Sequence, residues 1–321
     1  MEFLNNYAAF LEEKLGNYSF PKHPENLYQP LSYFLTLGGK RMRPIACLMG
    51  AKLFGSTNEK AVSAALEVEL FHNFTLIHDD IMDQAPLRRG KQTVHEKWNT
   101  NIAILSGDVL FVKAYQLLEA YDAHQLKSLL TLFNKTAIEV CEGQQMDMDF
   151  ESRKEVREAE YIEMIRLKTS VLLGCSLEMG AIVANTTPEN QQLIYDFGVN
   201  LGIAFQIQDD ILDLLGDPEK VGKQVGGDVM ANKKTLLSIE TKLLANSEQL
   251  EQLSKLENEI DLEKKVEQTK AIVHAVQADK KCREHIDFYY QKAINSLEKI
   301  NCQGSKKELF QLSQFLIERD Y

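Results

Sequence analysis

The chain has 321 residues, and 36 Lys and Arg against 47 Asp and Glu give it a formal net charge of −11. Hydrophobic residues make up 44% and charged residues 26%, which are ordinary values for a globular protein and exclude disorder as the main state. The acidic balance also argues against non-specific nucleic-acid binding, which depends on an excess of Lys and Arg, so we expect no nucleic-acid partner.

Helical periodicity dominates the chain, and 17 glycines and 7 prolines are few breakers for this length. Apolar residues recur three and four positions apart, on most of the circumference, in residues 61–82, 101–121, 126–141, 159–184 and 189–215. Such helices are typically buried in a large bundle. Residues 236–318 keep the spacing but are rich in Glu and Lys, which predicts an outer helical layer with a solvated face. The sequence therefore predicts an all-α fold.

The five cysteines form an odd set without C-x-x-C spacing. This predicts reduced thiols in a cytoplasmic protein rather than disulfides or a zinc site. The first residues are acidic and amphipathic, unlike a signal or transit peptide. The most apolar stretch, 171–184, is interrupted by Glu178 and is too short for a bilayer, so we expect no membrane span.

Two DDxxD sequences, residues 79–83 and 209–213, each end a strongly apolar helical run. Positions four apart share one face of a helix, so each motif places two carboxylates side by side. Neighbouring carboxylates repel unless a cation or proton lies between them. Mg²⁺ takes oxygen ligands and is usually bound by one or two carboxylates together with substrate phosphates. A single DDxxD is weak evidence, since it also suits a solvated helix end, but two after buried helices favour a metal site.

Three basic or glycine-rich segments, 37–44, 84–92 and 216–234, lie between the predicted helices. Arg binds phosphate through planar, bidentate hydrogen bonds and Lys through a point charge. Together with metal-binding carboxylates, these segments predict a polyphosphate site. No GxxxxGK[ST] sequence is present, so a P-loop nucleotide enzyme is excluded. The cations available for phosphates are Lys40, Arg41, Arg43, Arg88, Arg89, Lys223 and Lys233.

Six motifs in this order resemble the trans-isoprenyl diphosphate synthases, the polyprenyl synthetase family. They are GGKRMRP (38–44), LIHDDIMD (76–83), LRRG (87–90), KTS (168–170), FQIQDDILD (205–213) and GKQVGGD (222–228). The resemblance implies one isoprenoid synthase domain over residues 1–321, an antiparallel helical bundle around a central cavity, and a homodimer. It also implies Mg²⁺-dependent head-to-tail condensation of isopentenyl diphosphate with an allylic diphosphate.

The resemblance further implies roles for individual residues. Asp79, Asp83 and Asp209 would bind three Mg²⁺ ions on the allylic diphosphate, with the motifs facing each other and Asp80, Asp210 and Asp213 supporting them through water. The isopentenyl diphosphate site would comprise Lys40, Arg43, His72 and Arg89. Further contacts to the allylic diphosphate would come from Arg88, Lys168, Lys223 and Lys233. The catalytic residues near the reacting carbons would be Lys168, Thr169 and Gln206, and the departing diphosphate would accept the proton.

The length of the product is expected to depend on the helix that precedes the first motif. At about 1.5 Å per residue, Phe74 lies about 7.5 Å and Phe71 about 12 Å from Asp79 along that helix. These rings would form a floor under the growing tail, while Thr75 is small and leaves room. In this family such a pattern resembles short-chain synthases, which predicts geranylgeranyl diphosphate, with farnesyl diphosphate as the alternative. Ordinary core packing is the alternative role for Phe74.

Other functions remain open from sequence. A class I terpene cyclase also uses DDxxD, but it would not need GGKR and RRG, and its Asn/Ser/Glu metal motif is not seen. A head-to-head squalene-type synthase is disfavoured by GGKRMRP and FQIQDD. A non-catalytic prenyl diphosphate-binding subunit would lose aspartates, whereas both motifs are intact here. The charged C-terminal helices are also candidates for a partner-binding surface.

Overall fold

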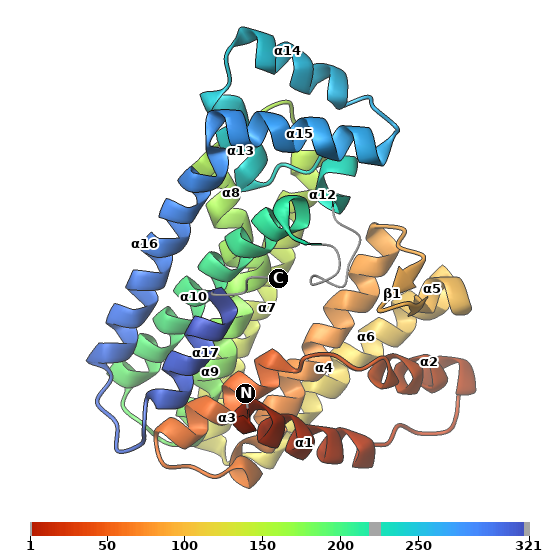
Figure 1. Cartoon of the computed structure of the whole chain (residues 1–321). Coiled ribbons are helices and arrows are strands. Elements are labelled where there is room, and N and C mark those ends of the chain that lie inside the picture. Colours follow the sequence, from red (N-terminus) through yellow and green to blue (C-terminus); the bar gives the residue numbers. More distant parts are fainter. Residues whose placement is uncertain (1, 218–225, 318–321) are drawn as a thin grey trace. The chain divides into compact units, whose positions relative to one another are not determined.

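The computed structural model of the chain describes residues 2–217 and 226–317 (Figure 1). Most of these residues are helical, which confirms the all-α prediction. The described part also contains one short antiparallel pair of strands, β1 (Leu87–Arg88) and β2 (Lys91–Gln92). In this pair Leu87 lies opposite Gln92, and Arg88 lies opposite Lys91. The pair holds the LRRG motif in a tight hairpin.

The chain forms two compact units. The first comprises Met1–Phe133, Ser176–Gln191 and Asn301–Ser305, and the second comprises Asn134–Cys175, Gln192–Ile300 and Lys306–Tyr321. Three helices contribute residues to both units: α7 (Ala123–Ser152), α9 (Val171–Val183) and α10 (Pro188–Leu215). A single domain over residues 1–321 stays a prediction.

The first unit is built around α4 (Asn58–Met82), which packs along α3 and α6 (Figure 1). The side chain of Thr57 accepts a hydrogen bond from the backbone N–H of Lys60 and begins the helix. The helix is buried over most of its length and ends at Met82, so its apolar body positions the first DDxxD motif at its C-terminal end. The other helices here are α1 (Glu2–Asn17), α2 (Glu25–Thr36), α3 (Met42–Leu53), α5 (Val94–Lys97), α6 (Thr100–Leu117) and η1 (Leu118–Ala120).

The second unit contains the second motif at the end of α10 and the Glu- and Lys-rich helices that follow it. The expected outer layer is confirmed, because Ile286, Ala293 and Leu297 of α16 are buried while most of its charged residues are exposed. α13 packs against α16, α15 and α8. The remaining elements are α8 (Glu158–Ile165), η2 (Arg166–Ser170), α12 (Gly227–Met230), α13 (Leu236–Leu244), α14 (Ser247–Leu256), α15 (Leu262–Val276), α16 (Ala278–Lys299) and α17 (Lys307–Ile317).

All five cysteines are free thiols, as predicted. By length and composition alone, one helix of the described chain, Thr100–Ala120, could cross a membrane. Core helices of soluble proteins meet the same criterion, and 33% of the residues in its most apolar window are buried here. The expectation of no membrane span rests on residues 171–184, the most apolar stretch of the sequence, and did not consider this helix.

Candidate active site

Both DDxxD motifs lie at the C-terminal ends of long buried helices, α4 and α10. Asp79 and Asp209 are half-buried and Asp83 is exposed. The C-terminal end of a helix carries a partial negative charge, so carboxylates there are destabilising unless a cation compensates them. Each motif therefore combines two unfavourable features, which are adjacent carboxylates and a negative helix end. A bound divalent cation would turn both into favourable interactions. The oxygen donors suit Mg²⁺.

The middle aspartate of the first motif is held by an arginine of the hairpin. Asp80 is 1% exposed, and its two carboxylate oxygens accept hydrogen bonds from Nε of Arg88, each at 2.9 Å. A nitrogen at the other end of the guanidinium, Nη2, lies 2.7 Å from Oδ1. Burial raises the pKa of Asp80, and the hydrogen bond from Arg88 opposes this shift. Arg88 keeps further N–H donors for a phosphate, because a guanidinium carries five.

The second motif is held by its own set of partners. Asp210 is buried, and it accepts hydrogen bonds from the Tyr161 hydroxyl and from Nε2 of Gln206, the latter at 3.0 Å. Burial raises the pKa of Asp210 to about 8, although the hydrogen bond from Tyr161 acts in the opposite direction. Asp213 accepts a hydrogen bond from the backbone N–H of Asp228 at 2.9 Å. The three supporting aspartates of the two motifs thus have protein partners in the structure.

The predicted isopentenyl diphosphate residues converge in the first unit. A Cβ on Gly39 would lie 2.8 Å from the guanidinium nitrogens of Arg89, so the first basic turn and the hairpin meet at this glycine. Nη1 of Arg43 donates to Nε2 of His72 at 3.1 Å, because a guanidinium can only donate. Burial, and then the charges of Arg43 and Arg89, hold the pKa of His72 well below its usual range. The result is a neutral imidazole in a positively charged pocket.

Two neighbouring cations of the basic turn, Lys40 and Arg41, have different environments. Lys40 is exposed, whereas Arg41 is 4% exposed and pairs with Glu69 at 2.5 Å and with Glu12 at 2.9 Å. Arg41 adopts the left-handed backbone conformation with φ of 50°, which turns its side chain into the unit. Arg41 was one of the cations considered for phosphates, but the structure commits it to these buried ion pairs.

The KTS motif lies in a segment of π-helix, η2, which inserts an extra residue between α8 and α9. Such segments are frequent at functional sites. A Cβ on Gly143 would lie 2.3 Å from the backbone nitrogen of Lys168, so this glycine lets α7 approach the segment closely. Nζ of Lys168 pairs with Asp147 at 2.5 Å, and the Thr169 hydroxyl donates to Oε1 of Gln206 at 3.2 Å. Thr169 and Gln206 therefore belong to a hydrogen-bond network that reaches Asp210, while Lys168 forms a separate pair with Asp147.

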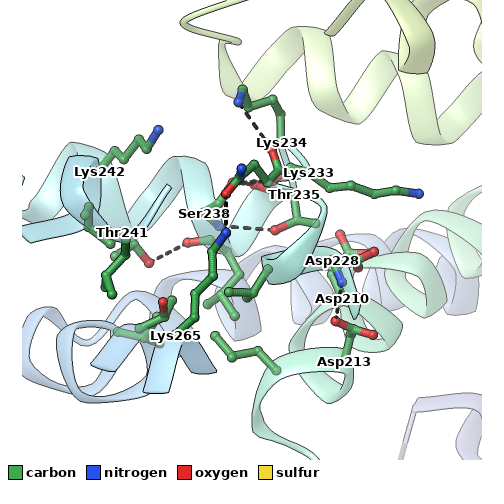
Figure 2. Close-up of a pocket in the computed structure, with 18 of the residues that line it drawn as sticks. Asp210, Asp213, Asp228, Lys233, Lys234, Thr235, Ser238, Thr241, Lys242 and Lys265 are labelled. Carbon is green, nitrogen blue, oxygen red and sulfur yellow. Dashed lines mark hydrogen bonds between the residues drawn. The ribbon is translucent and has the colours of Figure 1, made fainter. Parts of the chain in front are cut away.

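A pocket in the second unit lies beside the second motif (Figure 2). The backbone N–H of Lys233 bonds to the carbonyl of Asp228 at 2.9 Å, which ties the loop after α12 to the aspartates. Figure 2 shows Lys233 and Lys234 leaving this loop in different directions, with Lys233 on the side of Asp228. Lys223, the remaining predicted contact, lies outside the described residues.

The predicted floor is part of a larger aromatic cluster of the first unit. The ring of Phe74 stacks on Phe111 of α6 with centroids 4.8 Å apart, and Phe71 packs edge-on against Phe133 at 5.0 Å. Phe71 is fully buried, whereas Phe74 and Thr75 are only partly buried. The Thr75 hydroxyl donates to the carbonyl of His72 at 2.8 Å, so its polar atom is satisfied within the helix. A chain running along α4 would meet Phe74 first.

Sequence reasoning missed Tyr161, Phe111 and Asp228. Tyr161 gave no signal, because a tyrosine in an amphipathic helix is usually core and its bond to Asp210 spans 49 positions. Phe111 lies in an apolar helix where any ring fits the pattern. Asp228 is the last residue of the GKQVGGD motif, so its place in that motif could have marked it as a site residue.

Comparison with known proteins identifies the family of this chain. The polyprenyl synthetase family profile matches residues 24–293. A geranylgeranyl pyrophosphate synthase of Geoglobus acetivorans is 37% identical over 323 residues, covering 100% of this chain and 99% of that protein. A geranylgeranyl diphosphate synthase of Methanosarcina mazei is 38% identical, covering 99% of this chain and 97% of that protein.

A crystal structure of a geranylgeranyl pyrophosphate synthase superimposes with a TM-score of 0.93 at 44% sequence identity, covering 99% of both chains. With the profile matched over most of its length and relatives matched end to end, this chain belongs to the polyprenyl synthetase family.

Proposed function

We propose that this protein is a short-chain prenyl diphosphate synthase that joins isopentenyl diphosphate head to tail to an allylic diphosphate and ends at geranylgeranyl diphosphate. The observation that carries this reading is the presence of two chemically different groups of side chains, each of which suits a diphosphate. One is a pocket of arginines around a neutral His72, and the other consists of carboxylates at helix ends that call for a divalent cation. The full-length similarity to geranylgeranyl diphosphate synthases supports the same reaction.

The basic pocket is proposed to bind isopentenyl diphosphate through Lys40, Arg43, His72 and Arg89. Burial and then the neighbouring arginine charges hold the pKa of His72 well below its usual range, and this excess of positive charge supports the binding of an anion here. A bound diphosphate would neutralise this repulsion and leave His72 hydrogen-bonded to Arg43. No metal is needed for this half of the site, because four nitrogen-bearing side chains supply the donors.

The carboxylates Asp79, Asp83 and Asp209 are proposed to hold Mg²⁺, three ions in all, on the allylic diphosphate. Members of the family use a divalent metal, and the donor set of carboxylate oxygens fits Mg²⁺. Bound Mg²⁺ supplies charge stabilisation for a departing diphosphate. Arg88 and Tyr161 keep Asp80 and Asp210 in place beside these ligands. Lys168, Lys233, Lys223 and the remaining donors of Arg88 are proposed to contact the same diphosphate.

Ionisation of the allylic carbon–oxygen bond leaves a carbocation that needs nearby electron density and protection from water. Thr169 and Gln206 are proposed to present their oxygens to this cation, and their mutual hydrogen bond orients both. The alkene of isopentenyl diphosphate then attacks the cation and forms the new carbon–carbon bond. The proton that is lost from the adduct passes to the departing diphosphate. Lys168, oriented by Asp147, adds positive charge on the leaving-group side.

The twenty-carbon end point is proposed from the aromatic cluster. Phe74 is partly accessible and backed by Phe111, so a tail that reaches it meets a rigid wall rather than a movable side chain. Thr75 leaves space beside that wall. An end point at farnesyl diphosphate would need the wall closer to the metal ligands.

The protein is further proposed to act as a cytoplasmic homodimer. Three large apolar side chains of α6, Ile104, Leu105 and Val112, are 42%, 56% and 59% exposed, and their spacing places them on one face of the helix. Exposed apolar side chains gathered on one helix face are typical of an interface between proteins, and here they surround the exposed Asp108. The five free thiols fit a reducing compartment.

The reaction is tested by incubating the purified protein with farnesyl diphosphate, labelled isopentenyl diphosphate and Mg²⁺. The coupled product and the released diphosphate are quantified, with and without a chelator. We expect one diphosphate released per coupling, and loss of both signals with the chelator. Asp79→Asn and Asp209→Asn should each lower kcat by ~10²–10³-fold, while Asp287→Asn, at an exposed aspartate on α16, should not change it.

The alternative functions give different results in the same assay. A terpene cyclase would release diphosphate without isopentenyl diphosphate and would form a cyclic hydrocarbon. A non-catalytic binding subunit would bind the allylic diphosphate in the presence of Mg²⁺ without turnover. Either outcome from folded protein would overturn the proposed reaction.

A further inference from the structure

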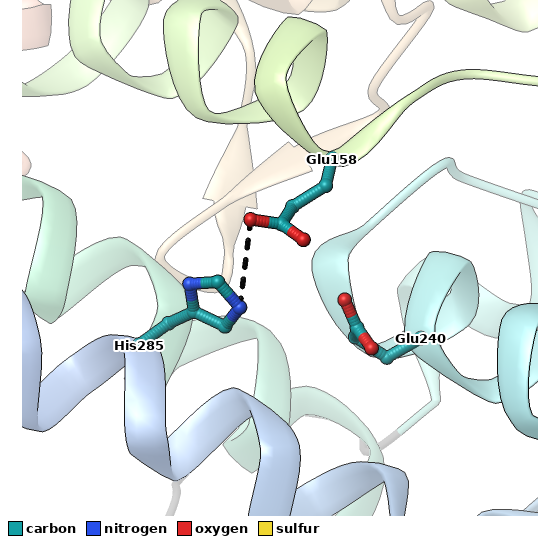
Figure 3. Close-up of side chains that lie close together, drawn as sticks. All are labelled: Glu158, Glu240 and His285. Atoms are coloured by element: carbon teal, nitrogen blue, oxygen red, sulfur yellow. Dashed lines mark ion pairs between the residues drawn. The ribbon is translucent and has the colours of Figure 1, made fainter.

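Three potential metal ligands that the proposed reaction does not use meet in the second unit. Glu158 begins α8, Glu240 lies in α13, and His285 lies in α16. One ligand atom from each lies within 4.8 Å of the others. Figure 3 shows the two carboxyl groups and the imidazole turned toward a shared space. The residues lie far apart in the sequence, so the fold itself brings this nitrogen and these oxygens together.

The carboxyl group of Glu240 is buried against another carboxyl. Glu240 is 4% exposed, and the side-chain hydrogen bond that the structure gives its carboxyl is to Glu158. Burial and then the charge of Glu158 raise the pKa of Glu240, while His285 and Lys281 act against this shift. Lys281 is only a partial counter-charge, since its Nζ pairs with Glu284 at 2.6 Å. A buried carboxylate beside a second carboxylate is destabilising unless a proton or a cation lies between them.

The imidazole of His285 adds an independent sign. Its Nε2 is buried and lacks a hydrogen-bond partner within the part of the chain that is described. The nearest carboxylate oxygen, Oε1 of Glu158, lies 3.6 Å away, which is beyond hydrogen-bond distance. A buried polar atom without a partner calls for an explanation such as a bound ion. This nitrogen and the buried carboxyl group of Glu240 face the same small space between the three helices.

We propose that Glu158, Glu240 and His285 form a binding site for one divalent transition-metal ion of the zinc type. Imidazole nitrogen and carboxylate oxygen are both Zn²⁺ ligands, and open zinc sites use three protein ligands with water in the fourth position. Mg²⁺ takes oxygen ligands and usually binds substrate phosphates, so the histidine favours a transition metal over the ion of the reaction. Ligand bonds of about 2.0–2.2 Å require the three side chains to close in slightly on the ion.

The site would clamp two elements that carry active-site residues. α8 leads directly into η2, which contains Lys168 and Thr169, and α13 follows the loop of Lys233. The side chain of Glu158 is 44% exposed, so an ion has access from solvent. The metal would replace the proton between the two carboxyls and would satisfy Nε2 of His285. Its role is to stabilise this part of the second unit, and it takes no part in condensation.

The test is the melting temperature of the chelator-treated full-length protein in excess Mg²⁺, with and without ZnCl₂. At a hundredfold excess over Kd, mass action predicts a rise in Tm of roughly 4 °C for the parent protein. Glu240→Gln and His285→Gln should abolish this rise. The matched control His274→Gln, an exposed histidine of the neighbouring α15, should keep it.

Zinc bound at the catalytic carboxylates would mimic this result, so Asp209→Asn is measured in parallel and should keep the full rise. Replacement by Co²⁺ gives a second readout, because a histidine ligand changes its visible absorption, and His285→Gln should remove that band. An equal rise in the parent and in His285→Gln would overturn the proposal. So would the absence of a rise in the parent together with a higher Tm for Glu240→Gln, which would indicate a proton-sharing carboxyl pair.

Discussion

Phe74 and Phe111 lie face to face, with ring centroids 4.8 Å apart and an interplanar angle of 14°. They come from α4 and α6, the two helices that pack along each other in the first unit. Phe111 in turn contacts Phe133 and Tyr115. The proposed floor is therefore a braced cluster, in which a ring on one helix is supported by rings on others.

Removal of either stacked ring should lengthen the product. Phe74→Ala opens the space below Thr75, and Phe111→Ala removes the support that keeps Phe74 in place. We expect both variants to add one or more isoprene units, as measured by mass spectrometry of the products. Phe288→Ala, at an exposed ring 56% accessible on α16, is the control and should keep the parent product. Unchanged products from both variants would show that these two rings do not limit the length of the product.

The buried pair of Arg88 and Asp80 should matter for both stability and catalysis. Arg88→Ala leaves Asp80 buried without its counter-charge. Breaking a fully buried pair lowers the free energy of unfolding by about 3–5 kcal/mol, and we expect about 2 kcal/mol here because the Arg88 side chain is 24% exposed. Denaturant unfolding measures this loss. Arg88→Lys should recover part of the stability and less of kcat, because a lysine ammonium restores the charge beside Asp80 but lacks the planar fork and the additional N–H donors of a guanidinium. Equal recovery of both would contradict a role at the diphosphate.

Gly143 should be required for the geometry of the KTS segment. A methyl group on Gly143 would lie 2.3 Å from the backbone nitrogen of Lys168, and backbone cannot move aside cheaply. Gly143→Ala should therefore lower kcat strongly and reduce Tm. Gly16→Ala is the matched control, since nothing lies within 4 Å of its added carbon, and it should slightly raise Tm. Normal kcat in Gly143→Ala would show that the π-helical segment does not depend on this close approach.

Glu67 should make stability fall as pH rises. Its side chain is fully buried, and neither carboxyl oxygen has a hydrogen-bond partner among the described residues. Burial raises its pKa well above the ordinary 4.5, so the folded protein holds a proton that the unfolded chain releases. The contribution of this group is complete below pH 4.5 and is lost as pH rises toward its pKa in the folded protein.

The measurement is the free energy of unfolding against pH for the parent protein and Glu67→Gln. Relative to the variant, the parent should lose about 1.4 kcal/mol per pH unit over the range in which only the unfolded state releases the proton. Glu67→Gln has a side chain of the same shape that does not titrate, so it is the reference for the parent protein. Parallel curves for the two proteins would mean that Glu67 titrates normally.

The sequence was a good guide to the helices and to the residues that carry charge. Strong periodicity marked α4 and α10, and DDxxD marked their ends, because these features depend on local spacing. The convergence of Arg89 with Gly39 was not visible in the sequence, since it depends on how a hairpin folds back over a turn. Nor does the sequence show that Lys40 is exposed while the adjacent Arg41 is buried in ion pairs.

Other features escaped prediction because they join distant segments. Tyr161 reaches Asp210 and Phe111 reaches Phe74 through tertiary packing alone. The β1–β2 hairpin was too short to show alternation, since each strand has two residues. The cluster of Glu158, Glu240 and His285 gave no motif either, because its members come from three separate helices.

The end point of chain growth tests the central claim most directly. The parent protein is incubated with dimethylallyl diphosphate, excess isopentenyl diphosphate and Mg²⁺, and the carbon number of the product is measured by mass spectrometry over time. We expect transient shorter intermediates and a discrete twenty-carbon product. A reaction that stops at fifteen carbons, or a series that continues beyond twenty, would contradict it.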